Sequence, residues 1–141
     1  MVSGWDIKLA VFVNSKRGSD FTWGELDCLS FANDAVRVMS GKGFCDDWVT
    51  DYTTSRQALR RYREKLAVEG FNDILEAVDS RLVRIKTIDC PSRGVIVARK
   101  MEGTVLNYSF GVCVGRKIAF MGEAGTVFFD PELKDHMWKL T

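Results

Sequence analysis

The stretch from residue 21 to residue 41 constrains the fold of this chain most strongly. Within it, apolar residues recur at the three- and four-residue spacing of one helical face: Cys28, Phe31, Ala32, Ala35 and Met39. Asp27 is a good N-cap for this helix, and Gly41 is suited to end it. Cys28 therefore becomes about the first residue inside the helix. There, unpaired backbone N–H groups and the positive end of the helix dipole favour a thiolate, the form of cysteine that acts as a nucleophile.

Length and composition indicate one soluble globular domain over residues 1–141. The chain is long enough to bury a core without disulfides, and 46% of its residues are hydrophobic. Its 20 basic and 19 acidic residues nearly cancel, so the overall charge gives no reason to expect nucleic acid or acidic lipid as a partner. The apolar run 9–13 is too short for a signal peptide, and no run approaches the roughly 20 apolar residues of a membrane span. We therefore expect neither.

The cysteines give no sign of a metal site or a disulfide framework. The four of them, Cys28, Cys45, Cys90 and Cys113, are far apart in sequence, and no CxxC pair or histidine occurs at metal-ligand spacing. We therefore expect no metal and no cofactor. Cys90 and Cys113 are expected to be buried as small apolar side chains.

Helical and β-like patterns occupy different halves of the chain. Helical spacing with suitable caps predicts helices over residues 28–40, 54–69 and 72–79, and residues 6–14 fit a helix better than a strand. Short β-like runs separated by Gly-bearing turns then predict strands at 82–85, 95–98, 104–114, 118–121, 126–129 and 137–140. Helices over about 1–80 and strands over about 81–141 predict an α+β fold. Its antiparallel meander either packs on the helices or curls into a small barrel.

Several motifs follow one another in a recognisable order: Trp23-Gly24, Asp27-Cys28, Phe31-Ala32, Tyr52, residues 56–59 and residues 111–115. This order resembles the NlpC-type cell-wall peptidases, which are papain-like cysteine hydrolases. It resembles more closely a branch of small phage and prophage proteins that are usually encoded among tail genes. The resemblance spans nearly the whole chain and implies a single NlpC-like domain.

The resemblance also implies three catalytic roles, of which this chain fills one. Cys28 matches the nucleophile. The histidine of the family lies two residues before the strand glycine, here Gly111, and its counterpart is Ser109, whose hydroxyl cannot exchange protons near neutral pH. A shift by one residue is not expected to help, because alternation would direct Tyr108 and Phe110 to the opposite sheet face.

The third role and the base have no obvious candidates. The third polar position falls near Phe120 or Met121, and neither can orient a base. The single histidine, His136, either restores a dyad by folding back onto Cys28 or is a solvated residue in a polar turn, which we favour. Without a base, amide hydrolysis should be very slow. We therefore favour a non-catalytic protein and interpret Cys28 as structural or vestigial.

Two further groups of residues suggest binding. Arg56, Arg60 and Arg63 lie on adjoining turns of the helix over 54–69, where they form either a strip for an acidic partner or, as we favour, a solvated face. No interleaved aromatics accompany them, so specific nucleic-acid binding is not expected. Trp48 and Phe44 lie in an expected loop and are candidates for a docking patch on another protein.

Two functions from different classes follow from the sequence. The preferred one is a structural or assembly component of a phage tail tip, built on a catalytically degenerate NlpC-like fold. Its partners would be other tail-tip proteins, with peptidoglycan as a further candidate. It would reside in the host cytoplasm during assembly and then in the virion tail. The alternative is an active cysteine hydrolase that cleaves peptidoglycan peptide or another amide with Cys28 as its nucleophile.

Overall fold

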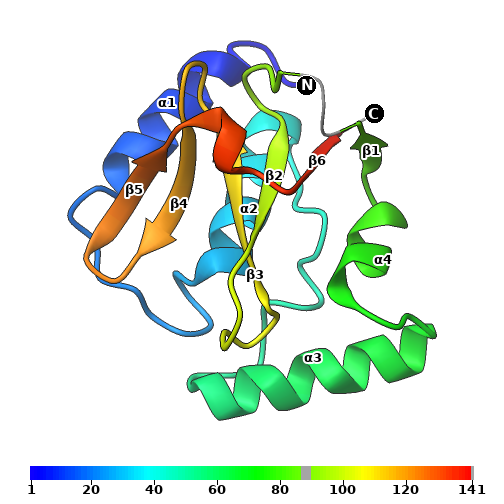
Figure 1. The fold of residues 1–141 in the computed structure, drawn as a ribbon. Helices are drawn as coiled ribbons and strands as arrows, with labels where there is room; N and C mark the ends of the chain where they lie inside the picture. Colours follow the sequence, from blue (N-terminus) through cyan, green and yellow to red (C-terminus); the bar gives the residue numbers. More distant parts are fainter. Residues whose placement is uncertain (87–89, 141) are drawn as a thin grey trace.

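Helices come first and strands second in the computed structural model, which describes residues 1–86 and 90–140 (Figure 1). The described helices are α1 (Trp5–Ser15), α2 (Cys28–Ser40), α3 (Ser55–Glu69), α4 (Ile74–Asp79) and the short 3-10 turn η1 (Pro131–Leu133). The described strands are β1 (Val83–Ile85), β2 (Ile96–Lys100), β3 (Tyr108–Cys113), β4 (Ile118–Gly122), β5 (Gly125–Phe129) and β6 (His136–Lys139). The predicted α+β fold is therefore confirmed.

The six strands form one antiparallel open sheet in the order β1-β6-β2-β3-β4-β5. Strands β2 to β5 make the predicted meander, whereas β6 returns across the sheet and pairs with both β1 and β2. Because β1 and β5 remain as edges, the small-barrel alternative is wrong. The meander packs on the helices instead.

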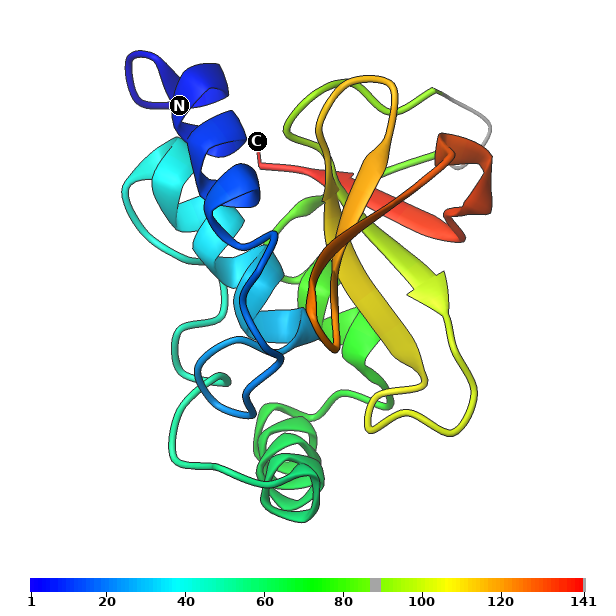
Figure 2. The same cartoon turned by 90° about the vertical axis from the view of Figure 1, so that its left-hand side faces the viewer.

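Two apolar cores lie on the two faces of this sheet. The larger one joins α2 to the sheet, and its buried members include Phe31, Ala32 and Phe110. The smaller one, on the opposite face, contains Phe120 and Met137. Figure 2 shows α1 and α2 together beside the sheet, with α3 below them. The N-terminal end of α2 therefore lies where the sheet and α3 approach each other.

The boundaries of α2 are set by the local chemistry that the sequence predicts. The Asp27 carboxylate accepts a hydrogen bond from the Ser30 backbone N–H (2.9 Å), and the Ser30 hydroxyl accepts one from the Asp27 N–H (2.8 Å), which is a capping box. At the other end, Gly41 adopts a left-handed conformation (φ 98°) that favours glycine. Cys28 is consequently the first residue of the helix, as expected.

Two expectations about individual positions are wrong. The strand expected from residue 104 begins only at Tyr108, because residues 104–107 form successive turns that end at Asn107 with a φ of 61°. Cys90 is exposed, whereas Cys113 is buried as expected. No helix within the described ranges is long and apolar enough to cross a membrane.

The docking patch predicted at Trp48 is also wrong. The Trp48 side chain is only 1% exposed and stacks on the Tyr62 ring, with a centroid distance of 5.9 Å. Phe44 is half-buried and packs against the same core. The reason is that α3 and α4 cover the loop after α2, so these aromatics stabilise the domain instead of facing solvent.

Candidate functional site

A cavity of about 880 Å³ opens where α2, α3 and the sheet meet. Its wall includes Cys28 at the start of α2. The other lining groups come from the loop before α2, from α3, from the β2–β3 connection and from the β4–β5 turn: Phe21, Trp23, Ser55, Arg56, Leu59, Tyr62, Arg63, Met101, residues 103–109, Met121, Gly122 and Glu123. This size is within the usual range for sites that hold a small molecule or a peptide side chain.

Cys28 is half-buried in this wall and carries a neutral thiol. Burial, and to a smaller extent the neighbouring Asp27 carboxylate, raises the pKa of the thiol to about 12. Hydrogen bonding to the backbone of Phe110 and Leu29 lowers the pKa, but by less. Desolvation and the like charge therefore outweigh the helix N-terminus, which by itself favours a thiolate.

Asp27 anchors a buried hydrogen-bond network behind the thiol. Its carboxylate is fully buried and accepts hydrogen bonds from the Gly24 N–H (2.9 Å), the Ser30 N–H (2.9 Å) and the Tyr52 hydroxyl (2.7 Å). The Tyr52 and Tyr62 hydroxyl oxygens are 2.6 Å apart. Because Tyr52 donates its only proton to Asp27, it accepts the one from Tyr62.

This network connects the cavity to the start of α2. Burial and the nearby Asp27 carboxylate raise the pKa of both Tyr52 and Tyr62 well above the usual range, so both hydroxyls remain neutral. Tyr62 itself lines the cavity. The sequence indicated Asp27 as a cap and Tyr52 as part of a recurring motif, but it gave no sign that the two residues bond to each other.

Strand β3 presents a different face to α2 from the one expected. Phe110 is buried in the core that contains α2, and Tyr108 packs against that core. Ser109 is paired with Arg99, whose guanidinium lies over the Phe129 ring on the other face. The expectation that Tyr108 and Phe110 face away is therefore wrong, because burial of a phenylalanine fixes the register of the strand.

Ser109 and Met121 lie on the cavity wall with Cys28, but they bring it no catalytic partner. Alternation directs the Ser109 side chain to the sheet face of Phe120, away from α2. Met121 is buried, and Phe120 belongs to the smaller core. None of these side chains can orient a base or exchange a proton with the thiol near neutral pH.

His136 lies in β6 and is not brought to Cys28. Its Cα is paired with Ala98, which is paired in turn with Phe110, so His136 lies two strand spacings, roughly 9.6 Å, from the backbone beside the thiol. Its Nδ1 accepts a hydrogen bond from Arg84 Nη1 (2.6 Å), because a guanidinium only donates. Burial lowers the His136 pKa, and so does the Arg84 charge.

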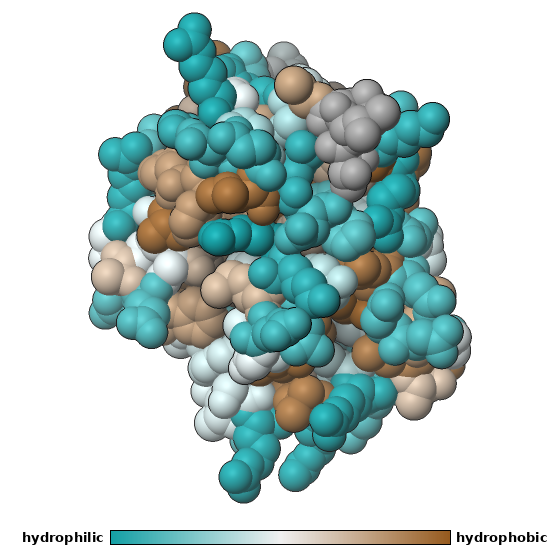
Figure 3. All heavy atoms as spheres, in the orientation of Figure 1, coloured by the Kyte–Doolittle hydropathy of each residue, from teal (hydrophilic) through white to brown (hydrophobic). Residues whose placement is uncertain are grey.

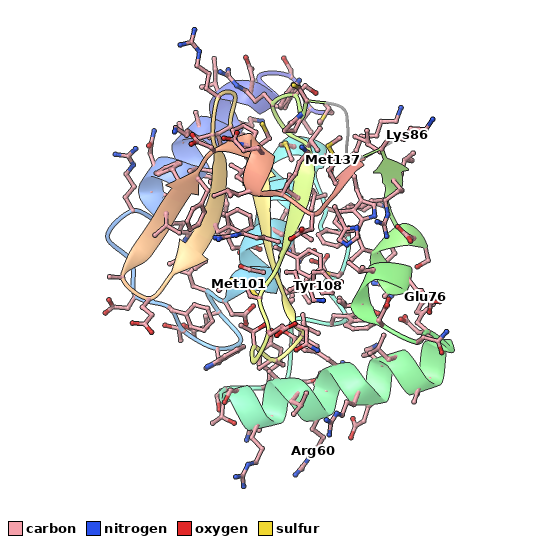
Figure 4. All side chains as sticks on the ribbon, viewed as in Figure 1. Arg60, Glu76, Lys86, Met101, Tyr108 and Met137 are labelled. Atoms are coloured by element: carbon pink, nitrogen blue, oxygen red, sulfur yellow. The ribbon has the colours of Figure 1, made fainter. Side chains whose placement is uncertain are left out.

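The predicted arginine strip divides into two parts. Arg56 and Arg63 line the cavity, whereas Arg60 projects from α3 away from the sheet (Figure 4). All three are exposed, and within the described ranges no acidic side chain lies at ion-pair distance from them. The cations of α3 that do pair, Arg61 and Lys65, contact Asp51 and Asp47.

The fold and the site together define an α+β domain in which a cysteine opens a helix at a cavity wall. A family described as a domain of unknown function, DUF6950, matches residues 1–140. The chain therefore belongs to the DUF6950 family. No curated protein matches the chain. Among the described residues, no group of three or more His, Cys, Asp or Glu side chains gathers as metal ligands would.

Proposed function

We propose that this chain is a non-catalytic NlpC-like domain that acts by binding other proteins, as a structural or assembly component of a phage tail tip. One observation carries the non-catalytic part: the Cys28 thiol lies in a large cavity whose described lining residues include no imidazole. The tail-tip setting rests on the resemblance of the motifs around Cys28 to small phage tail-gene proteins.

The chemistry of Cys28 supports this proposal. With its pKa raised to about 12, the thiol remains protonated at pH 7. Amide hydrolysis also needs a group that protonates the leaving amine, and Ser109 and Met121 cannot supply that proton. The lone histidine is engaged by Arg84 in another part of the sheet.

The cavity gathers apolar side chains in a way that makes it a candidate binding site. On the face shown in Figure 3, apolar side chains lie in separate small groups among hydrophilic ones. The cavity, in contrast, gathers Phe21, Trp23 and Leu59 around one hollow. Concave sites with aromatic walls are where protein partners usually insert their anchoring side chains.

An active cysteine hydrolase is the second candidate, and one observation favours it. Cys28 stands at the start of α2, in a cavity large enough for a peptide, with the backbone of Phe110 close to its sulfur. This placement is suitable for a nucleophile. Amide hydrolysis by Cys28 would need a base other than the side chains that line the described cavity.

Complementation separates the two functions. The gene is deleted from its phage or prophage, and wild type or Cys28→Ser is supplied in trans. The proposal predicts that deletion prevents tail completion and that Cys28→Ser restores infectious particles as well as wild type does. In parallel, purified protein is incubated with peptidoglycan sacculi, and no new amines should be released. Failure of a folded Cys28→Ser variant to restore particles, together with amine release by wild type only, would support the hydrolase instead.

A further inference from the structure

We infer that the cavity binds an extended protein segment in which an acidic side chain adjoins a large apolar one. This inference rests on the proposed binding function and specifies the chemistry of the partner. It is carried by two features of the cavity lining: a group of partly exposed apolar side chains, and two arginines that have no acidic partner among the described residues.

The apolar wall is built for a bulky side chain. Phe21 and Trp23 pack edge to face, with ring centroids 4.9 Å apart, and both remain partly exposed to the cavity. Leu59 contributes from α3 and is also only half-buried. Partly exposed aromatic and leucine groups that surround one hollow gain free energy when an apolar anchor displaces water from them.

The charges on the wall select the neighbours of that anchor. Arg56 and Arg63 are exposed and, among the described residues, have no acid within ion-pair distance. A guanidinium binds a carboxylate through two parallel hydrogen bonds, so these side chains favour an aspartate or glutamate next to the anchor. Glu123, in the β4–β5 turn, is the single carboxylate among the described lining residues. Because it repels an acidic side chain, it directs the acidic end of the segment toward the arginines of α3.

Nucleic acid fits this arrangement less well than an acidic protein segment. Arg60 projects away from the cavity, so only two cations of the strip act together, and Glu123 opposes a continuous phosphate backbone. Peptidoglycan stem peptides carry carboxylates but no large apolar side chain, so they would leave the aromatic wall unfilled. Both therefore serve as contrary outcomes of the test.

The inference is tested by selecting displayed, randomised twelve-residue peptides on the purified full chain. Wild type should enrich peptides in which Asp or Glu lies next to Leu, Phe or Trp. The double variant Arg56→Glu/Arg63→Glu should instead enrich Lys or Arg beside the same apolar residues. Arg60→Glu is the matched control, because it makes the same change on α3 outside the cavity, and it should select as wild type does. Arg56→Gln/Arg63→Gln should lose the acidic preference without gaining a basic one.

Affinities of the selected peptides are then measured by fluorescence anisotropy. The double charge reversal should weaken binding at least tenfold, and Arg60→Glu by less than twofold. The inference is overturned if wild type enriches no peptides, if enriched peptides lack acidic residues, or if Arg60→Glu weakens binding as much as the double variant does. Displacement by soluble peptidoglycan stem peptides or by single-stranded DNA at equal concentration would overturn it as well.

The same samples separate this inference from the proposed function. Mass spectrometry shows whether a bound peptide remains intact. Cleavage that Cys28→Ser abolishes would contradict the non-catalytic function while leaving the charge preference in place. Intact peptides whose binding ignores Arg56 and Arg63 would overturn only the present inference.

Discussion

Two carboxylates on different parts of the fold each accept three hydrogen bonds, but from different kinds of donor. Asp27, at the start of α2, is fully buried and is bound by two backbone N–H groups and the Tyr52 hydroxyl. Asp79, at the end of α4, is exposed and accepts from Arg84 Nε (2.7 Å), Arg84 Nη2 (3.0 Å) and Trp138 Nε1 (2.7 Å). Neutral donors alone fix the first cluster, whereas a cation donates two of the three hydrogen bonds in the second.

This difference explains what each cluster does to a candidate catalytic group. The Asp27 cluster places a buried negative charge beside Cys28 and opposes ionisation of its thiol. The Asp79 cluster holds Arg84, which in turn occupies Nδ1 of His136. Burial and the Asp27 cluster together therefore keep the cysteine neutral. The Asp79 cluster keeps His136 engaged two strand spacings away from the Phe110 backbone, which lies beside Cys28.

Removing the buried carboxylate should have the largest effect. Asp27→Ala leaves the Tyr52 hydroxyl and two backbone N–H groups without their acceptor, and it also removes the cap of α2. We expect a loss of about 3–5 kcal/mol in the free energy of unfolding. Asp27→Asn, which retains an acceptor oxygen, should lose about half as much. Urea denaturation of both variants measures the difference, and equal losses would show that the carboxylate charge matters more than the acceptor.

Shortening the tyrosine chain should cost less. Tyr52→Phe removes a donor from the buried Asp27 and should reduce the free energy of unfolding by about 2 kcal/mol, whereas Tyr62→Phe, at the end of the chain, should cost about 1 kcal/mol. A double-mutant cycle in urea should show that the two losses are not additive, because the hydroxyls form one chain. Strict additivity would indicate that the two bonds act independently.

The Arg84 cluster should contribute least, because it is largely solvated. Arg84→Ala should cost about 0.5 kcal/mol after solvent screening. It should also raise the pKa of His136, because a positive neighbour is removed. NMR titration of the single imidazole in wild type and Arg84→Ala measures this shift directly. An unchanged or lower His136 pKa in the variant would mean that the Arg84 charge does not lower the pKa of this imidazole.

The pH dependence of stability follows from the same histidine. In the folded state its pKa lies below the unfolded value of about 6.5. The unfolded state therefore binds more protons in this window, and the contribution of neutral His136 is fully present above about pH 6.5. It is lost as the pH falls through the folded pKa. His136→Phe should remove this slope from urea midpoints measured between pH 5 and 7.

Some parts of this molecule could be predicted from local sequence and others could not. The Asp27 cap and the Gly41 end of α2 depend on residues a few positions away, so the pattern sufficed. The Asp27–Tyr52 bond spans 25 positions and the Arg84–His136 bond spans 52, and no local pattern encodes either. The partners of each candidate catalytic group were therefore beyond sequence reasoning.

The wrong expectations have the same origin. At Cys28 the helix N-terminus, which is local, favours a thiolate, but burial and the neighbouring Asp27 carboxylate raise the pKa of the thiol. Trp48 lies in a loop, which suggested exposure, yet α3 packs over it. Likewise, the face that β3 turns to α2 is chosen by burial of Phe110 in a core made largely by other elements.

The most direct test of the non-catalytic claim is the rate of Cys28 alkylation by iodoacetamide as a function of pH. Peptide mapping separates Cys28 from the exposed Cys90, which serves as a reference for reagent access in the same molecule. We predict that Cys28 stays unreactive near neutral pH, that its rate still rises with pH at pH 10, and that His136→Ala changes neither. Rapid alkylation of Cys28 at pH 6–7 that His136→Ala abolishes would reveal a working dyad and contradict the account.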